Sequence, residues 1–243
     1  MNKKILVIGD SCRDVHIYCS SDRMCPDKPV PILKIIDQND NPGMAKNVYR
    51  NIKTMVNSCD IVTNSNWYNI TKSRYIHKST NHMFMRVDSS EEMKRINLSE
   101  ISYDYDIVVV SDYDKGFLTE SDIATICERH PSVFLDSKKI LGPWALKAKF
   151  IKINNYEYHR SERFLTSDLD AKIIKTSGES GCYYIGERFP VEQQDVIDVS
   201  GAGDSFMAGL VIEYSKSGDV RTAIRFANEC ASKVVRQKGV SVI

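Results

Sequence analysis

The stretch Asp198-Val-Ser-Gly-Ala-Gly-Asp204 leads directly into the apolar run Ser205-Phe-Met-Ala-Gly-Leu-Val-Ile-Glu-Tyr214. Apolar residues in this run recur at helical spacing, so a helix is expected to begin just after a tight turn at residues 201–203. Free backbone N–H groups at such a helix start favour a bound anion, and small residues let the anion approach closely. Asp204 falls in the first helical turn, as a carboxylate beside that anion. The pattern therefore predicts an anion site with an adjacent base, which suits phosphoryl transfer.

An ordinary turn is the alternative for this stretch, with Asp204 merely stabilising the helix dipole. Two other phosphate-binding motifs are excluded by the residues present. A dinucleotide fingerprint beginning at Gly201 would need glycine at position 206, where the chain has Phe206. A Walker A loop would need Gly-Lys-Ser/Thr, which the sequence does not contain.

Length and composition predict one domain over residues 1–243, because 243 residues with 42% hydrophobic content are enough for one well-buried core. The 33 basic and 32 acidic residues leave a net charge of +1, so we expect neither nucleic acid nor membrane as a partner. The seven cysteines are odd in number and include no Cys-x-x-Cys pair, which argues against a disulfide framework and a zinc site. Together with the lack of a signal-peptide pattern, this favours a cytoplasmic location.

Short, continuous apolar runs indicate strands that are buried on both faces. They lie at residues 4–8, 107–110, 132–135, 149–153 and 172–175. Helical patterns occur at 119–128, after the start signal Thr119-x-x-Asp122, and at 220–234. Alternating buried strands and helices predict a parallel α/β sheet, whose ligand site lies at the carboxyl ends of the strands.

Polar groups follow each of these strands in the sequence. They are Gly9-Asp10, Ser111-Asp-Tyr113, Asp136-Ser-Lys138, residues 154–157 and Thr176-Ser-Gly178. Any one of them could be an ordinary strand-ending turn. Their occurrence after all five strands favours a shared site instead.

Two stretches break the alternation. Residues 16–36 contain three prolines before an apolar run, and residues 71–88 alternate polar and apolar side chains as exposed antiparallel strands do. We expect a small β lid with strands within 14–36 and 71–88. Such a lid could close over substrate, or pair with a second copy to form a homodimer.

Ten short motifs, in order along nearly the whole chain, carry a family resemblance. They are Gly9-Asp-Ser-Cys-Arg-Asp14, Cys25-Pro-Asp-Lys-Pro-Val-Pro-Ile32, Pro42-Gly-Met-Ala-Lys-Asn-Val48, Thr71-Lys-Ser-Arg74, Met85-Arg-Val-Asp88, Ser111-Asp-Tyr-Asp-Lys-Gly116, Asp136-Ser-Lys138, Asn154-Asn-Tyr-Glu157, residues 198–204 and Phe226-Ala-Asn228. The chain resembles the ribokinase-like (PfkB-type) carbohydrate kinases, and within them the heptose 7-phosphate kinases of bacterial surface-sugar and lipopolysaccharide synthesis. The resemblance implies an α/β fold: a three-layer sandwich with a mainly parallel central sheet and a small β lid.

The resemblance also implies roles for residues on both sides of the transferred phosphoryl group. Asp204 would be the catalytic base, and the backbone of Gly201, Ala202 and Gly203 would form the anion hole. The expected sugar-binding residues are Asp10, Asp14, Gly43 and Asn47. The lid residues Lys72, Arg74 and Arg86 could hold a phosphate already on the sugar, or could simply line a solvated strand face.

On the nucleotide side, the resemblance implies ATP bound near Thr176, Gly178 and Asn228. Asn154 and Glu157 match an element that helps hold Mg²⁺ through water. ATP and Mg²⁺ are therefore the expected cofactors, and a sugar phosphate the expected small-molecule partner.

The implied activity is transfer of the ATP γ-phosphate to heptose 7-phosphate at its anomeric hydroxyl. One departure from the family pattern is that only residues 53–70 separate the first helix from Thr71, where relatives carry a longer stretch. We therefore expect a trimmed sheet edge and a sugar pocket that is partly rebuilt. The chain also ends soon after the helix at 220–234, without the nucleotidyltransferase domain that some heptose kinases carry.

Two alternatives stay open at this point, and a third is excluded by the residues present. A ribokinase-type kinase could act on another sugar or a nucleoside, and a shortened kinase fold could serve as a binding or assembly module without turnover. Gly9-Asp10-Ser11 also resembles the nucleophile block of an esterase. That esterase mechanism needs a histidine preceded by aspartate three positions earlier, and none of the five histidines has one.

Overall fold

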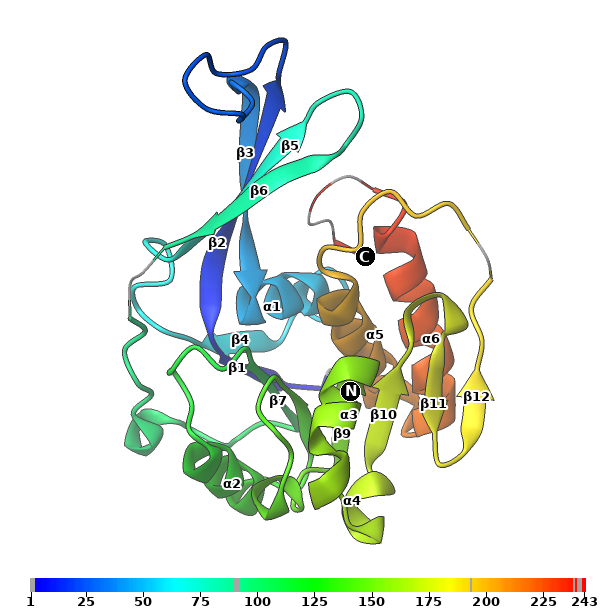
Figure 1. The fold of residues 1–243 in the computed structure, drawn as a ribbon. Coiled ribbons are helices and arrows are strands. Elements are labelled where there is room, and N and C mark those ends of the chain that lie inside the picture. The colour runs from blue at the N-terminus through cyan, green and yellow to red at the C-terminus, as the bar shows by residue number, and fades with distance from the viewer. Residues whose placement is uncertain (1–2, 90–91, 193, 238, 240–241) are drawn as a thin grey trace.

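The computed structural model describes residues 3–89, 92–192, 194–237, 239 and 242–243. Its centre is an eight-stranded sheet with the order β12-β11-β10-β9-β8-β7-β1-β4 (Figure 1). The strands are β1 (Ile5–Gly9), β4 (Cys59–Val62), β7 (Ile107–Asp112), β8 (Val133–Ser137), β9 (Phe150–Asn154), β10 (Ile173–Thr176), β11 (Cys182–Tyr184) and β12 (Glu187–Phe189). Six neighbouring strands, β10, β9, β8, β7, β1 and β4, pair in parallel, and β11 and β12 add an antiparallel hairpin. The predicted α/β class with a mainly parallel sheet is confirmed.

Helices cover both faces of this sheet, because alternate residues of each strand point to opposite sides. Ile5 and Val7 of β1 join one buried cluster with α1, α5 and α6, whereas Leu6 and Ile8 join a second cluster with α2. The first layer holds α1 (Ala45–Lys53), α5 (Ala202–Ser217) and α6 (Val220–Val234). The second holds α2 (Glu120–Arg129), α3 (Asn155–Ser161) and α4 (Ser167–Asp170).

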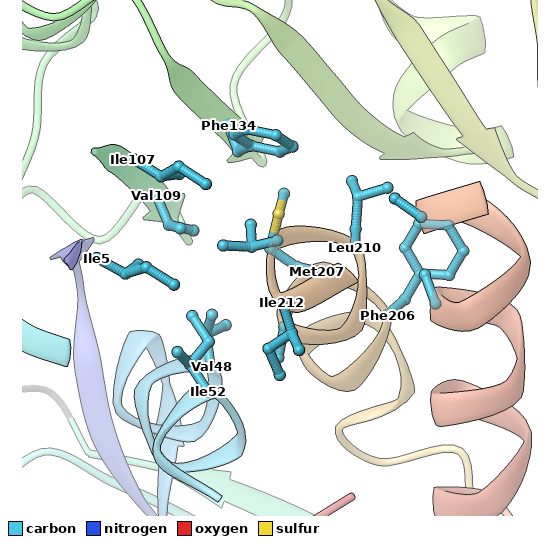
Figure 2. Close-up of a cluster of buried hydrophobic side chains, with 14 of the residues drawn as sticks. Ile5, Val48, Ile52, Ile107, Val109, Phe134, Phe206, Met207, Leu210 and Ile212 are labelled. Carbon is cyan, nitrogen blue, oxygen red and sulfur yellow. The ribbon is translucent and has the colours of Figure 1, made fainter. Parts of the chain in front are cut away.

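Helix α5 is the centre of the first layer, and its residues 204–212 are all buried. Met207 and Leu210 point toward Phe134 and Val109 of the sheet, and Ile212 lies beside Val48 and Ile52 of α1 (Figure 2). On the α6 side, a Cβ added to Gly209 would lie 2.8 Å from Cys230 Sγ. Glycine at this position therefore lets α5 and α6 pack closely. This packing fixes the start of α5 relative to the sheet.

A second, four-stranded sheet projects from one end of the sandwich (Figure 1). We call it the lid; it consists of β2 (Ser11–Ser20), β3 (Lys34–Met44), β5 (Thr71–His77) and β6 (Met83–Asp88) in the order β3-β2-β5-β6. Strands β5 and β6 lie within the range predicted for the lid, 71–88. The other predicted range, 14–36, misses the start of β2 and most of β3. Its proline-rich part lies in the connection between these strands.

The short stretch between α1 and the lid forms the edge strand β4 and a loop that packs at the base of the lid. In this loop Asn64 Oδ1 accepts a hydrogen bond of 2.8 Å from the Ser11 backbone N–H at the start of β2. The Arg13 guanidinium lies 4.6 Å from the ring centroid of Tyr68, and the Lys46 ammonium 4.0 Å from that of Trp67. The loop therefore supports the lid from the sandwich side. Within the described ranges, no helix has both the length and the apolar character needed to cross a bilayer.

Candidate active site

The turn before α5 has the geometry that its glycines indicate. Gly201 is the N-cap residue of α5 and has a φ of 81°, in the left-handed region that glycine adopts without strain. Asp198 holds the turn from behind: its Oδ1 accepts from the Ser200 N–H at 2.8 Å and its Oδ2 from the Gly239 N–H at 3.0 Å. The Ala202 N–H donates to the Val199 carbonyl at 3.2 Å. The N–H groups of residues 203 and 204, for which no such bond to a described residue is present, are the ones presented at the end of this long buried helix.

Asp204 lies in this first turn and is only 5% exposed. Its Oδ1 accepts a hydrogen bond of 2.5 Å from the Tyr113 hydroxyl, and its Oδ2 one of 2.9 Å from Asn47 Nδ2. Burial raises the pKa of this carboxyl to about 6, although both hydrogen bonds favour the charged form. The group is thus a carboxylate near neutral pH with a greater proton affinity than an exposed aspartate, as a general base requires.

A cavity of about 350 Å³ opens in front of Asp204, between the sandwich and the lid. It is lined by Asp14, Met44, Lys72, Arg74, Arg86, Tyr113, Lys115, Lys138, Ser200, Gly201 and Asp204. We call it the acceptor cavity. Five of its side chains are cationic and two are carboxylates, so it presents an excess of positive charge.

The cations that the lid contributes differ in their partners. Arg74 forms an ion pair with Asp14, which lies on the adjacent strand β2. A Cβ at Gly43 would lie 2.2 Å from Asp14 Oδ2, so the glycine makes room for this carboxylate. Arg86 donates two hydrogen bonds to Asp88, of 2.7 and 2.6 Å. The lid therefore brings Asp14, Lys72, Arg74 and Arg86 together, with Gly43 behind them.

Asp10 and Asn47 do not line the acceptor cavity. Asp10 is fully buried; its Oδ2 accepts from the Lys115 N–H at 2.8 Å, and its carbonyl oxygen accepts from the Ala45 N–H that begins α1. Burial and the neighbouring charge of Asp112 raise the Asp10 pKa to about 6. Asp10 therefore supports the cavity wall, and Asn47 supports the base.

A second cavity, of about 540 Å³, lies on the other side of the glycine turn. Its lining includes Thr176, Gly178 and Asn228, together with apolar side chains such as Phe206. Ala202 and Gly203 border this second cavity, whereas Gly201 and Asp204 border the acceptor cavity. The start of α5 therefore separates the two cavities, and we call the second one the nucleotide cavity. Asn228 also donates a hydrogen bond of 3.0 Å to the Phe189 carbonyl.

Asn154 and Glu157 form a capping box at the start of α3. Asn154 Oδ1 accepts from the Glu157 N–H at 2.9 Å, and Glu157 Oε2 accepts from the Asn154 N–H at 2.8 Å. Lys138 donates to Glu157 Oε1 at 2.5 Å. Glu157 Oε2 accepts only from the Asn154 N–H among the described residues, so it can also accept a hydrogen bond from a water on Mg²⁺. The pair therefore fits an indirect role in holding the ion. Among the described residues, no group of three or more His, Cys, Asp or Glu side chains could hold a metal ion directly.

Five residues of the acceptor cavity were given no role from the sequence: Met44, Tyr113, Lys115, Lys138 and Ser200. The polar groups that follow β7 and β8 signalled that this region belongs to a site. The contact of Tyr113 with Asp204 joins positions 91 residues apart and had no local signal.

The comparisons with known proteins agree with this geometry. Residues 160–242, which include the glycine turn and α5, match the model of the pfkB family carbohydrate kinases. This part of the chain is therefore similar to the pfkB carbohydrate kinases, and the resemblance implied by the motifs is confirmed there.

Two relatives of the chain are the bifunctional proteins HldE of a Nitratiruptor species and of Helicobacter pylori. Each is 28% identical, over 99% and 98% of this chain respectively. The chain spans 63% and 64% of the length of these two proteins.

Solved structures show the same fold at lower identity. Ribokinase from Thermotoga maritima superposes with a TM-score of 0.74 at 16% identity, over 98% of this chain and 94% of that one. Arabidopsis thaliana ribokinase, complexed with ribose and ATP, gives a TM-score of 0.67 at 15% identity, over 98% and 94%. The chain therefore has the ribokinase-like fold.

Proposed function

We propose that this chain is an ATP-dependent sugar kinase that transfers the γ-phosphate of ATP to a hydroxyl of a phosphorylated sugar. The observation that carries the proposal is the position of Asp204. It lies in the helix turn that separates two cavities, with its carboxylate on the side where an acceptor hydroxyl would bind. A module that only bound ligands would not need a buried base at this position.

The mechanism follows from this arrangement. The sugar hydroxyl loses its proton to Asp204 as its oxygen forms a bond to the γ-phosphorus, and the bond from that phosphorus to the bridging oxygen of ADP breaks. The N–H groups at the start of α5 stabilise the charge on the phosphoryl oxygens during transfer. Mg²⁺, when bound, neutralises charge on the phosphates; Glu157 and Asn154 are the residues that would hold it through water.

The charge of the acceptor cavity supports a substrate that is already phosphorylated. Lys72, Arg74, Arg86, Lys115 and Lys138 surround a space that contains only two carboxylates, Asp14 and Asp204. Arg74, Arg86 and Lys138 are already paired with Asp14, Asp88 and Glu157. Lys72 and Lys115 form no ion pair with a described residue, and a phosphate on the sugar would give these two lysines a partner that a neutral sugar or nucleoside lacks. Because several motifs resemble the heptose 7-phosphate kinases, heptose 7-phosphate is the first candidate, with its anomeric hydroxyl as acceptor.

The lid supports a further proposal, that two copies of the chain pair through it. Cross-strand pairing places Ile35, Met85 and Val87 on the lid face opposite to Arg74 and Arg86. These three apolar side chains are 61%, 51% and 49% exposed. An apolar sheet face that is open to solvent is a typical contact surface, and a second lid would cover it.

The replacement Asp204→Asn tests the proposed activity. ADP release is measured with free and phosphorylated sugars, heptose 7-phosphate among them. We expect turnover with a phosphorylated sugar in the wild-type protein and a loss of about 10²- to 10⁴-fold in the variant, since a general base contributes about this much. Asp168→Asn, an exposed position on α4, is the matched control and should keep full activity.

Two outcomes would contradict the proposal. Turnover that survives unchanged in Asp204→Asn would remove the base from the mechanism. A wild-type protein that releases no ADP with any sugar, while still binding ATP, would favour the binding module instead.

A further inference from the structure

Both oxygens of the Asp204 carboxylate have a hydrogen-bond donor within the protein. Asn47 Nδ2 donates to Oδ2, and the Tyr113 hydroxyl donates to Oδ1. The two donors differ in position: Tyr113 lines the acceptor cavity, whereas Asn47 does not. The Tyr113 hydroxyl therefore approaches Asp204 from the side that an acceptor hydroxyl would use.

The chemistry of Tyr113 suits it to this position. Burial, and then the negative charge of Asp204, raise the Tyr113 pKa well above its usual value of 10. The phenol therefore keeps its proton and donates it to the carboxylate throughout the neutral pH range. A phenol oxygen bound to Asp204 Oδ1 resembles a sugar hydroxyl bound there, but it is part of the protein and its ring holds it at the cavity wall.

Two lysines hold the ring in place. The Lys72 ammonium lies 4.9 Å from the Tyr113 ring centroid, and the Lys138 ammonium lies 5.4 Å from it. These are cation–π distances. Lys72 comes from the lid strand β5, and Lys138 follows β8 of the sandwich. Both lysines also line the acceptor cavity, so an anionic substrate would compete with the ring for their charge.

We propose that Tyr113 guards Asp204: its hydroxyl occupies the place of the acceptor hydroxyl until a sugar phosphate binds, and so prevents the base from activating water. This role of Tyr113, which we call the guard, rests on the proposed kinase function. It would make the kinase specific for a sugar hydroxyl over water as the acceptor. When a sugar phosphate binds, its phosphate engages Lys72 and Lys138, the ring loses their contact, and the sugar hydroxyl replaces the phenol on Oδ1.

The guard matters because water is a competing acceptor. With Oδ1 free, a water in the cavity could pass its proton to Asp204 as its oxygen bonds to the γ-phosphorus, and the bond to ADP would break. The products would be ADP and inorganic phosphate, with no sugar phosphorylated. Asp204 is only 5% exposed, and of its two hydrogen-bond donors it is the Tyr113 phenol, on the cavity side, that stands between Oδ1 and such a water.

The replacement Tyr113→Phe removes the hydroxyl and keeps the ring. We measure ADP release with ATP alone and with the sugar phosphate that the wild-type protein uses. The ratio of sugar-independent to sugar-dependent turnover should rise about tenfold or more, because a hydrogen bond to a charged group contributes about 1.5–3 kcal/mol. Tyr105→Phe is the matched control: it removes another tyrosine–aspartate hydrogen bond, of 3.0 Å to Asp60, which lies outside the lining of both cavities.

A second measurement needs no nucleotide. The protein is labelled with ¹³C at the tyrosine Cζ atoms and studied by NMR. The Tyr113 signal is the one that is lost in Tyr113→Phe. Its shift in Asp204→Asn identifies it a second time and does not depend on how well Tyr113→Phe folds. Addition of the sugar phosphate without ATP should move this signal as the phenol leaves Asp204. Titration of the empty protein should also move it, with a midpoint near the Asp204 pKa of about 6.

The outcomes separate the guard from the kinase function. If the wild-type protein turns over a sugar phosphate but Tyr113→Phe leaves the ratio unchanged, the guard is wrong and the kinase assignment stands. A Tyr113 signal that does not move on binding of the sugar phosphate also overturns the guard. If no sugar supports turnover in the wild-type protein, the kinase function itself fails, and the guard fails with it.

Discussion

At the scale of single residues, Asp204 and Asp10 have similar pKa values but different places in the site. Both values are raised to about 6, chiefly by burial, although Asp204 borders the acceptor cavity and Asp10 does not. Only Asp204 can take a proton from an acceptor hydroxyl in that cavity. The two carboxyls can therefore be separated by their effects on the pH dependence of activity.

We expect kcat/KM for the sugar phosphate to fall as the pH falls through about 6, because protonated Asp204 cannot act as a base. Well below this pH, the loss should approach tenfold for each unit. The measurement is a pH profile of ADP release between about pH 5 and 8. Asp10→Asn should keep the same acid limb; if the limb disappears in this variant while activity persists, the titrating group is Asp10.

The sequence could predict the residues of this site whose signals are local. The glycines and Asp204 lie within one short motif at a helix start, and the structure places Gly201 in the left-handed conformation that such a turn needs. Tyr113 could not be assigned a role, because its contact with Asp204 depends on how β7 and α5 pack. Asn47 had the opposite outcome: it was expected on the sugar, and in the empty site it holds the base.

At the scale of elements, two helices begin with a capping box, and only one of the two was predicted. Thr119 and Asp122 at the start of α2 form the reciprocal pair that their spacing indicates. Asn154 and Glu157 at the start of α3 have the same geometry, but they were interpreted through the family resemblance as residues for Mg²⁺. The two roles are compatible, since one carboxylate can cap a helix and accept a hydrogen bond from a water on the ion.

Replacement of Glu157 by Gln and by Ala separates these roles. Glutamine can still accept from the Asn154 N–H but carries no charge, whereas alanine loses the cap as well. We expect Glu157→Ala to lower the Tm by about 2–4 °C more than Glu157→Gln, because a lost cap costs about 1 kcal/mol. Both variants should need more Mg²⁺ for half-maximal activity. The measurements are thermal unfolding and a Mg²⁺ titration of ADP release. If Glu157→Gln needs no more Mg²⁺ than the wild-type protein, Asn154 and Glu157 only cap the helix and do not help to hold the ion.

At the scale of the whole molecule, the sandwich was more predictable than the lid. Five strands of the sandwich, β1, β7, β8, β9 and β10, are short apolar runs, and each was predicted from its own residues. The edge strands β4, β11 and β12 were not predicted, because they are short and include polar residues. The lid depends on pairing between distant segments: β2 and β5 pair in parallel, with Asp14 opposite Lys72. No local sign in the sequence indicated that β3 extends to Met44, because Asp37 to Asn41 are polar, and Asp37 to Asp40 are exposed in the structure. Lid strands therefore need tertiary contacts to define them.

The same pairing leads to the prediction about assembly. Residues directly across β2, β5 and β6 share a face, so the cationic residues Arg74 and Arg86 face the acceptor cavity while Met85 and Val87 face away from it. A dimer formed through the second face would leave the first free for substrate. It would also hold both lids in a fixed shape, because the β6 strands would no longer be open to solvent on that side.

We expect the wild-type protein to elute as a dimer in size-exclusion chromatography with light scattering, and Met85→Lys with Val87→Lys to elute as a monomer. Two ammonium groups on each copy would be costly to bury against each other, whereas in the monomer they stay in water. Phe164→Lys is the matched control, because Phe164 is 54% exposed but lies on the sandwich, away from the lid. A wild-type monomer, or a double variant that stays dimeric, would contradict pairing through the lid. If the monomeric variant also shows a higher KM for the sugar phosphate with an unchanged KM for ATP, the dimer supports the acceptor cavity through the lid.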